Sequence, residues 1–280
     1  MRIDTGLTDG TRARNFPPWL EDEMSNLETV RDEFGRQAET FDRWAVKTDE
    51  KSGERFIAAL GNSVKGAVLD VACGPGVVTA AVAPHATSVT AFDATEAMIG
   101  KARARCQAAG LANVVFRIGD AHDLPFETGQ FDGVVSRLAV HHFTDPGRAI
   151  GEMARVLKPG GMLVVADITV SDDKADADLQ NAIEILRDPS HVAMLPQARL
   201  IRHFRDAGLG VVATESWDKE REFGEWMGIV NDASRLWPLQ TVVAALTEAG
   251  RDAGMGLRME EGRIRFFHRW CLVSGRKATG

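Results

Sequence analysis

The fold is decided by the stretch Val-Leu-Asp-Val-Ala-Cys-Gly-Pro-Gly at residues 68–76. Its apolar, partly β-branched beginning is typical of a buried strand, and this strand runs into a turn with two glycines. Gly74 and Gly76 carry no Cβ, so the backbone there can bend sharply and approach a ligand closely. The helix expected after the turn offers unpaired N–H groups at its start. We therefore predict a strand that brings a ligand to its carboxyl end.

Two further predicted strands also end beside an acid. The strand at 88–92 is followed by Asp93, and the strand at 114–118 runs into a glycine and Asp120. The carboxyl ends of parallel strands meet at one edge of an open α/β sheet, and such sheets bind ligands at that edge. Asp70, Asp93 and Asp120 are therefore expected at one site.

Apolar strands alternate with helices from residue 66 to residue 168, which predicts a mostly parallel sheet with helices on both faces. The expected strands are 66–71, 87–92, 113–118, 131–136, 161–168, 210–217 and 263–274. We predict an α/β fold with a Rossmann-like, seven-stranded sheet in a domain at 63–280, preceded by a helical part at 1–62. Insertions at about 170–200 and 219–260, the second largely helical, should sit above the carboxyl edge of the sheet.

The composition of the chain limits which partners and which cellular compartment we expect for it. The 280 residues, 44% of them hydrophobic, can form one large core. The formal net charge of −7 opposes a polyanionic partner, so we expect no nucleic acid. No run approaches the roughly 20 apolar residues of a membrane span, and the first residues lack a secretory stretch, so we expect a cytoplasmic protein with no membrane span. The three scattered cysteines indicate neither a disulfide framework nor a metal site.

A series of motifs follows in a recognisable order. They are DVACGPG at 70–76, the acid at 93, GDAHDLPF at 119–126, FDGVVSRLAVHHFTDP at 131–146 and EMARVLKPGGMLVVADI at 152–168. In this order the chain resembles the class I S-adenosylmethionine-dependent methyltransferases, in the branch of the ubiquinone and menaquinone biosynthesis enzymes and related small-molecule tailoring enzymes. The resemblance implies S-adenosylmethionine as cofactor, a small organic acceptor and in-line displacement. It also implies a helical lid at 1–62, where Phe41 lines the pocket or only packs in the core.

Within this resemblance, the ribose and the methionyl part of the cofactor have candidate partners. Asp93 can accept hydrogen bonds from the ribose hydroxyls, as acids do in dinucleotide folds. Gly74 and Gly76 let the backbone approach the methionyl part. Asp70 can meet its ammonium group directly or through water.

The adenine and the methionyl carboxylate have candidates further along the chain. Met98 can cover the adenine with a polarizable side chain, and core packing is the alternative. Asp120 and Ala121 can bind the adenine edge through a carboxylate and a backbone N–H. Arg137, at the end of the fourth strand, can face the carboxylate.

A catalytic base is needed only if the acceptor must lose a proton. His141 and His142 follow the fourth strand, and one imidazole could take that proton near neutral pH. A His and an Asp at similar places are implicated in related O-methyltransferases, and the resemblance implies His141 with Asp167. The alternative is a structural role, in which case alignment with the sulfur–methyl bond supplies most of the rate.

Two other functions compete with methyl transfer. A nicotinamide oxidoreductase would need G-x-G-x-x-G, and Thr79 stands where the third glycine belongs. A protein that binds S-adenosylmethionine without methylating, as a cyclase or a partner subunit, is the alternative that stays open. The oligomeric state also stays open, and a homo-oligomer is one option. The identity of the acceptor stays open as well. Trp226, Trp237 and Phe223 point either to an apolar or aromatic acceptor or to a core.

Overall fold

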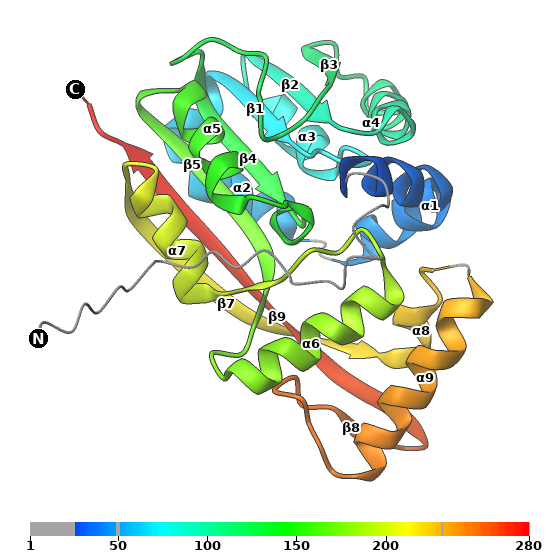
Figure 1. Ribbon diagram of the computed structural model, residues 1–280. Helices are drawn as coiled ribbons and strands as arrows, with labels where there is room; N and C mark the ends of the chain where they lie inside the picture. The colour runs from blue at the N-terminus through cyan, green and yellow to red at the C-terminus, as the bar shows by residue number, and fades with distance from the viewer. Residues whose placement is uncertain (1–25, 49–50, 231, 280) are drawn as a thin grey trace, which may run out of the picture.

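The structure is a computed structural model that describes residues 26–48, 51–230 and 232–279. Within them lies a nine-stranded sheet whose main path runs β3-β2-β1-β4-β5-β9-β7. The long strands β9 and β7 run side by side past the end of the other strands, as Figure 1 shows in red and yellow. The molecule therefore has a parallel half and an antiparallel extension.

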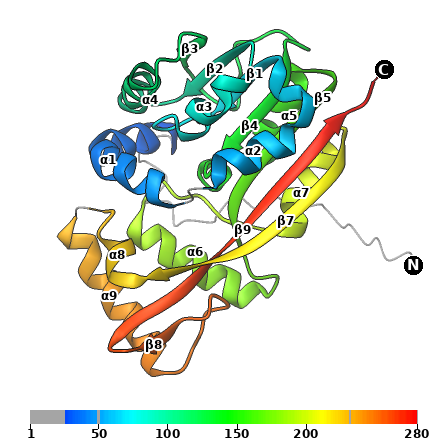
Figure 2. The same ribbon diagram turned by 180° about the vertical axis from the view of Figure 1, so that it is seen from behind.

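The parallel half carries the ligand-binding edge. Its strands are β1 Ala67–Val71, β2 Ser88–Asp93, β3 Val114–Ile118, β4 Phe131–Arg137 and β5 Leu157–Val170. Its helices are α2 Ser52–Leu60, α3 Val77–Val82, α4 Glu96–Ala108, α5 Pro146–Val156 and α7 Gln197–Asp206. Figure 2 shows α2 and α3 on the near face of the sheet and α7 on the far face. Ile150 of α5 and Phe204 of α7 pack in one core cluster, and Phe56 of α2 and Val78 of α3 pack in another. Because helices cover both faces, the strand ends are the part of the sheet open to a ligand.

The antiparallel extension forms a second, smaller core. Strand β9 Arg263–Lys277 pairs antiparallel with both β5 and β7 Leu209–Glu222. The extension also contains α6 Lys174–Arg187, α8 Phe223–Met227, α9 Ala233–Glu248 and β8 Arg258–Glu260. Its core gathers apolar side chains from these elements, among them Ile183, Phe223, Trp226, Leu239 and Phe266. Helix α6 thereby packs in this core through its apolar side.

The predicted fold class is confirmed, but the predicted number of strands was wrong. The described part of the chain has nine strands instead of seven, because the short β6 Leu195–Pro196 pairs with β5 and the short β8 pairs with β9. Pairings this short leave no period-2 pattern in a sequence. Strand β7 also continues into the stretch expected to be helical from 219, because its pairing with β9 extends to Glu222 and Arg265.

Helix α1 Asn26–Thr48 lies beside α4 (Figure 1). Ion pairs of Lys101 with Glu39 and of Arg105 with Asp42 join the two helices. Residues 1–25 of the predicted lid lie outside the described residues, and the division at 62 stays a prediction. In the described residues, no helix is both long and apolar enough to cross a membrane.

Gly76 tests how the first turn is packed. Its φ is 78°, and a Cβ there would lie 2.8 Å from the Cβ of Ala102 on α4. We expect Gly76→Ala to lower the free energy of unfolding by about 1–3 kcal/mol, through the left-handed backbone and overpacking. In the control Gly100→Ala, the new Cβ meets nothing within 4 Å. We expect this change to raise the free energy of unfolding by up to about 1 kcal/mol, since Ala favours a helix more than Gly does. Urea unfolding measures both, and a Gly76→Ala variant as stable as the parent would contradict the prediction.

Candidate active site

A cavity of about 380 Å³ opens at the carboxyl edge of the parallel strands, under α1. Most residues predicted to bind the cofactor line it: Phe41, Asp70, Gly74, Asp93, Met98, Asp120, Ala121 and Arg137. Gly76 is not among the lining residues, since it packs against α4. Cavities of a few hundred cubic ångströms are typical of small-molecule sites.

The floor of the cavity is the turn after β1. Gly74 has a φ of 52°, and its backbone N–H donates to Asp93 Oδ2 over 2.8 Å. The backbone N–H of Thr95 donates to Asp93 Oδ1 over 2.9 Å. Among the described atoms within 4 Å, a Cβ on Gly74 would meet only the Phe41 ring, at 3.9 Å. The turn therefore leaves room for a ligand between itself and α1.

Two buried acids give this floor its electrostatic character. Burial raises the pKa of Asp93 above its ordinary value, although the N–H groups of Gly74 and Thr95 oppose the rise. Burial also raises the pKa of Asp70 to about 7, despite a hydrogen bond of 2.6 Å from Thr79 Oγ1. A positively charged ligand group would favour the ionised form of both acids.

The other end of the cavity is polar at its rim. His122 Nδ1 lies 2.7 Å from Asp120 Oδ1, and the backbone N–H of His122 donates to the same oxygen over 2.9 Å. Partial burial alone would raise the pKa of Asp120, but these contacts with His122 hold it below the ordinary value. Met98 is buried and also lines the cavity, so its position fits both roles considered for it.

A second pocket, of about 30 Å³, adjoins the first cavity. Phe34, Phe41, Leu138 and His142 line both. His141 lines only the second pocket. The structure thus places the predicted base beside the cavity that gathers the predicted cofactor residues, in a separate compartment.

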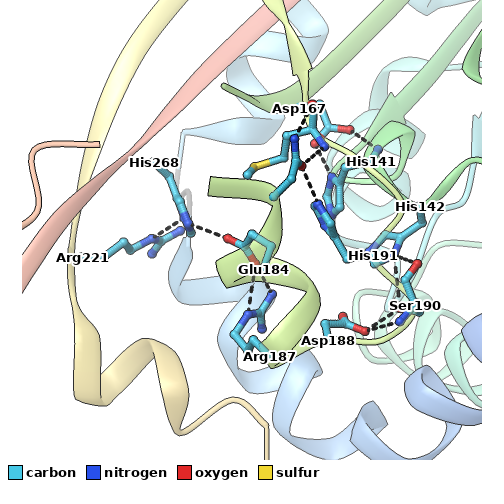
Figure 3. Close-up of polar contacts among 12 residues, drawn as sticks. His141, His142, Asp167, Glu184, Arg187, Asp188, Ser190, His191, Arg221 and His268 are labelled. Atoms are coloured by element: carbon cyan, nitrogen blue, oxygen red, sulfur yellow. Dashed lines mark hydrogen bonds and ion pairs between the residues drawn. The ribbon is translucent and has the colours of Figure 1, made fainter. Parts of the chain in front are cut away.

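Asp167 of β5 holds His141 (Figure 3). His141 Nδ1 lies 2.5 Å from Asp167 Oδ1, and the backbone N–H of His141 donates to Oδ2 over 3.2 Å. Because an ionised carboxylate only accepts hydrogen bonds, Nδ1 carries the proton and Nε2 is the nitrogen left for a ligand. Burial lowers the pKa of His141, but the Asp167 carboxylate outweighs it, and the net pKa lies above the ordinary value.

His142 occupies a different environment. Its Nδ1 lies 3.0 Å from the backbone oxygen of Ser190 and 3.2 Å from Ser190 Oγ, which itself donates to Asp188 over 2.6 Å. Burial, together with the charge of His141, lowers the pKa of His142 to about 4. His142 is therefore a neutral ring at neutral pH, fixed by its Nδ1–H in the wall that the two cavities share.

Sequence reasoning missed the polar side chains that α6 and the loop after it bring to this region (Figure 3). Glu184 Oε1 lies 3.1 Å from His268 Nε2, and Arg187 donates to Glu184 Oε2 from both Nε and Nη2. Burial opposes ionisation of Glu184, but Arg187 and His268 hold its pKa far below the ordinary value. No motif marks these positions, and their one signal is the polar residues of the predicted insertion at about 170–200.

The aromatic residues singled out in the sequence separate in the structure. Trp226 lines the second pocket, and Phe223 is buried in the core of the extension. Trp237 is 72% exposed, because α9 packs through its opposite side with Leu239 and Val243. Only Trp226 of these three thus belongs to the site.

Known proteins resemble this chain over most of the parallel half. A family model described as "Methyltransferase domain" matches residues 69–165. The "Uncharacterized methyltransferase YcgJ" of Bacillus subtilis is 32% identical, over 57% of this chain and 63% of its own length. A phosphatidylethanolamine N-methyltransferase of Cereibacter sphaeroides is 32% identical, over 54% of this chain and 77% of its own length. The crystal structure of the B. subtilis YcgJ protein matches with a TM-score of 0.76 and 28% identity, covering 83% of this chain and 100% of that one.

Replacing Asp167 tests the electrostatics of the second pocket. In Asp167→Asn the carboxylate that raises the pKa of His141 is gone, so burial should dominate and the pKa should fall below the ordinary value. The control Asp218→Asn removes a carboxylate from the surface pair with Arg269 and should leave His141 unchanged. NMR titration of the imidazole measures the shift, and an unaltered His141 in Asp167→Asn would contradict the assignment.

Proposed function

The chain belongs to the S-adenosylmethionine-dependent methyltransferases, and we propose that it transfers the methyl group of S-adenosylmethionine to a small organic acceptor. The observation that carries this proposal is the pair of adjoining cavities. The larger one gathers the glycine turn and the buried acids, and the smaller one is lined by His141, whose ring Asp167 holds from behind. We assign the larger cavity to the cofactor and the smaller to the acceptor.

The larger cavity would supply partners for the ribose, the ammonium group and the carboxylate of this cofactor. Asp93 would accept hydrogen bonds from the ribose hydroxyls with the lone pairs that Gly74 and Thr95 leave unused. Asp70 would face the ammonium group and Arg137 the carboxylate. The open space above Gly74 would take the methionyl chain.

The remaining predicted residues complete this assignment. Asp120 and Ala121 would bind the adenine edge, and Met98 would cover its face. Phe41 would close the cavity from α1, since it lines both compartments. Gly76 would support the turn by its packing on α4 and not by touching the ligand.

The smaller pocket supplies a base and excludes water. When bound, S-adenosylmethionine supplies an electrophilic methyl group on a positively charged sulfur. For a hydroxyl acceptor, His141 Nε2 would take the hydroxyl proton while the oxygen bonds to the methyl carbon and the sulfur–methyl bond breaks. Asp167 would keep the ring in the correct tautomer and stabilise the imidazolium that forms. Phe34 and Phe41 would shield the reacting atoms from water and help to align them.

The relatives named as methyltransferases favour methyl transfer over the non-methylating alternative. A small organic acceptor, the absence of a nucleic-acid partner, a cytoplasmic location and assembly into a homo-oligomer stay predictions. The test of the function is turnover. A methyltransferase forms S-adenosylhomocysteine in equal amounts with a methylated acceptor, whereas a protein that only binds the cofactor forms none.

Asp93→Ala tests the cofactor assignment. The variant should bind S-adenosylhomocysteine more weakly by about 1.5–3 kcal/mol, the range for hydrogen bonds to a charged group. The control Asp123→Ala removes an exposed carboxylate that does not line the cavity and should bind normally. Calorimetry measures the affinities, and thermal unfolding verifies that both variants fold. An unchanged affinity in Asp93→Ala would overturn the assignment.

The pH dependence tests the base. Only neutral His141 can accept a proton, and its pKa lies above the ordinary 6.5, so the rate with a hydroxyl acceptor should rise with pH through a limb above that value. His141→Ala should lower the rate about 10²–10⁴-fold and remove the limb, with the affinity for S-adenosylhomocysteine nearly intact. The control His85→Ala changes an exposed residue and should keep both rate and limb. If the ascending limb of the rate–pH profile remains in His141→Ala, His141 is not the base and has a structural role.

A further inference from the structure

Two tryptophans stack on one another in the antiparallel extension of the sheet. Trp217 of β7 and Trp270 of β9 are direct cross-strand partners, and their ring centres lie 5.7 Å apart with an angle of 18° between the planes. Each ring also has an arginine over it. The Arg55 guanidinium carbon lies 3.8 Å from the centre of the Trp217 ring, and that of Arg137 lies 5.6 Å from the centre of the Trp270 ring. The four side chains therefore form one row of contacts from α2 to the end of β4.

The register of the sheet brings Arg137 to this row. Arg137 pairs with Ala166 of β5, and Ile168, two residues further along β5, pairs with Trp270. Residues two apart in a strand point to the same face of a sheet, as do directly paired residues of neighbouring strands. Because Ala166 carries only a methyl group, the Arg137 side chain has room to cross β5 and reach the Trp270 ring. Strand pairing thus sets this contact.

The contact joins the two compartments of the site. Arg137 lines the larger cavity, whereas Trp270 lines the second pocket and is fully buried. Among the described residues, the indole Nε1 of Trp270 has no hydrogen-bond partner, so the contacts that this side chain makes there are those of its ring. Indole has the strongest ring face for a cation, and burial strengthens the attraction. The Trp270 ring therefore restricts where the Arg137 guanidinium can lie.

We infer that Trp270 is a positioning residue, whose ring holds the Arg137 guanidinium ready for the carboxylate of the cofactor. This inference rests on the proposed function, which assigns that carboxylate to Arg137. A long arginine side chain that is already held loses less conformational freedom when its ligand binds. Trp217 supports the Trp270 ring from β7. Neither tryptophan lines the larger cavity, so both act on the cofactor only through Arg137.

Two ligands isolate the carboxylate. S-adenosylhomocysteine carries it, and decarboxylated S-adenosylhomocysteine keeps the adenosine and the ammonium group but lacks it. Calorimetry on the full chain measures both dissociation constants, and their ratio is the carboxylate preference. We expect the parent to prefer S-adenosylhomocysteine about tenfold or more, as for hydrogen bonds between charged groups. In Arg137→Met the preference should fall to about twofold or less.

Variants of Trp270 test whether its ring holds the arginine. Trp270→Leu removes the ring and should lower the preference about threefold or more, whereas Trp270→Phe keeps a ring and should lower it by less than about twofold. Added to Arg137→Met, Trp270→Leu should lower the preference no further, because the two residues act as one unit. The control Trp237→Leu changes a tryptophan that is 72% exposed and should keep the preference of the parent.

Thermal unfolding verifies that the variants of this buried residue fold. If Trp270→Leu does not fold, Trp217→Leu removes the half-buried ring of the pair and should lower the preference about twofold or more. Three results would overturn the inference. They are a loss of affinity in Trp270→Leu that is equal for both ligands, a preference lowered as much in Trp270→Phe as in Trp270→Leu, and a preference that Trp217→Leu leaves unchanged.

The same measurements separate this inference from the proposed function. If neither ligand binds, both fail. If S-adenosylhomocysteine binds but the parent shows no carboxylate preference, the cofactor-binding function stands and the inference fails. If the preference depends on Trp270 but no acceptor is methylated when S-adenosylmethionine is supplied, the positioning role stands and methyl transfer fails.

Discussion

The larger cavity depends on one buried carboxylate, that of Asp93. It accepts the backbone N–H groups of Gly74 and Thr95, and so ties the turn after β1 to the start of α4 after β2. The same burial raises the pKa of Asp93, and the charge of Asp93 adds to the raised pKa of Asp70. Two neighbouring acids under this constraint favour a cationic ligand, because its charge relieves their repulsion and their desolvation. The turn and the two acids that form the floor of the cavity therefore also favour the binding of a positively charged ligand.

The roof of both cavities is a single helix, α1, and polar contacts anchor it to several other parts of the chain, two of which involve buried or half-buried ion pairs. Glu33 is 4% exposed and accepts two hydrogen bonds of 2.9 Å from Arg235 of α9. Arg105 of α4 pairs with Asp42 near the other end of α1. Because α1 lines both cavities, one helix covers both the space assigned to the cofactor and the space assigned to the acceptor. A shared roof suits the proposed transfer, which needs the two ligands held in one alignment.

The larger cavity could be predicted from the sequence because its residues follow strands. Asp70, Asp93 and Asp120 each sit at or near a strand end, and the parallel sheet brings such ends to one edge. In the second pocket the sequence pointed to His141 with its partner Asp167, and to Phe41, His142 and Trp226. Its other polar residues, such as Arg187 on α6 and Arg221 on β7, meet through the packing of the antiparallel extension. Local patterns carry no information about that packing, and Arg221 even lies where a helix was expected.

The adjacent histidines show how packing gives one residue type two functions. Their ring centres are 4.3 Å apart, so two positive charges there would repel strongly. Asp167 raises the pKa of His141, whereas burial and, after it, the charge of His141 lower the pKa of His142, which therefore stays neutral. This order matters for the proposed chemistry, because His142 lies in the wall shared with the cavity assigned to a cationic cofactor. A neutral ring in that wall adds no repulsion to the sulfonium, while His141, the ring that would gain a proton in the proposed step, lines the second pocket and is held by Asp167.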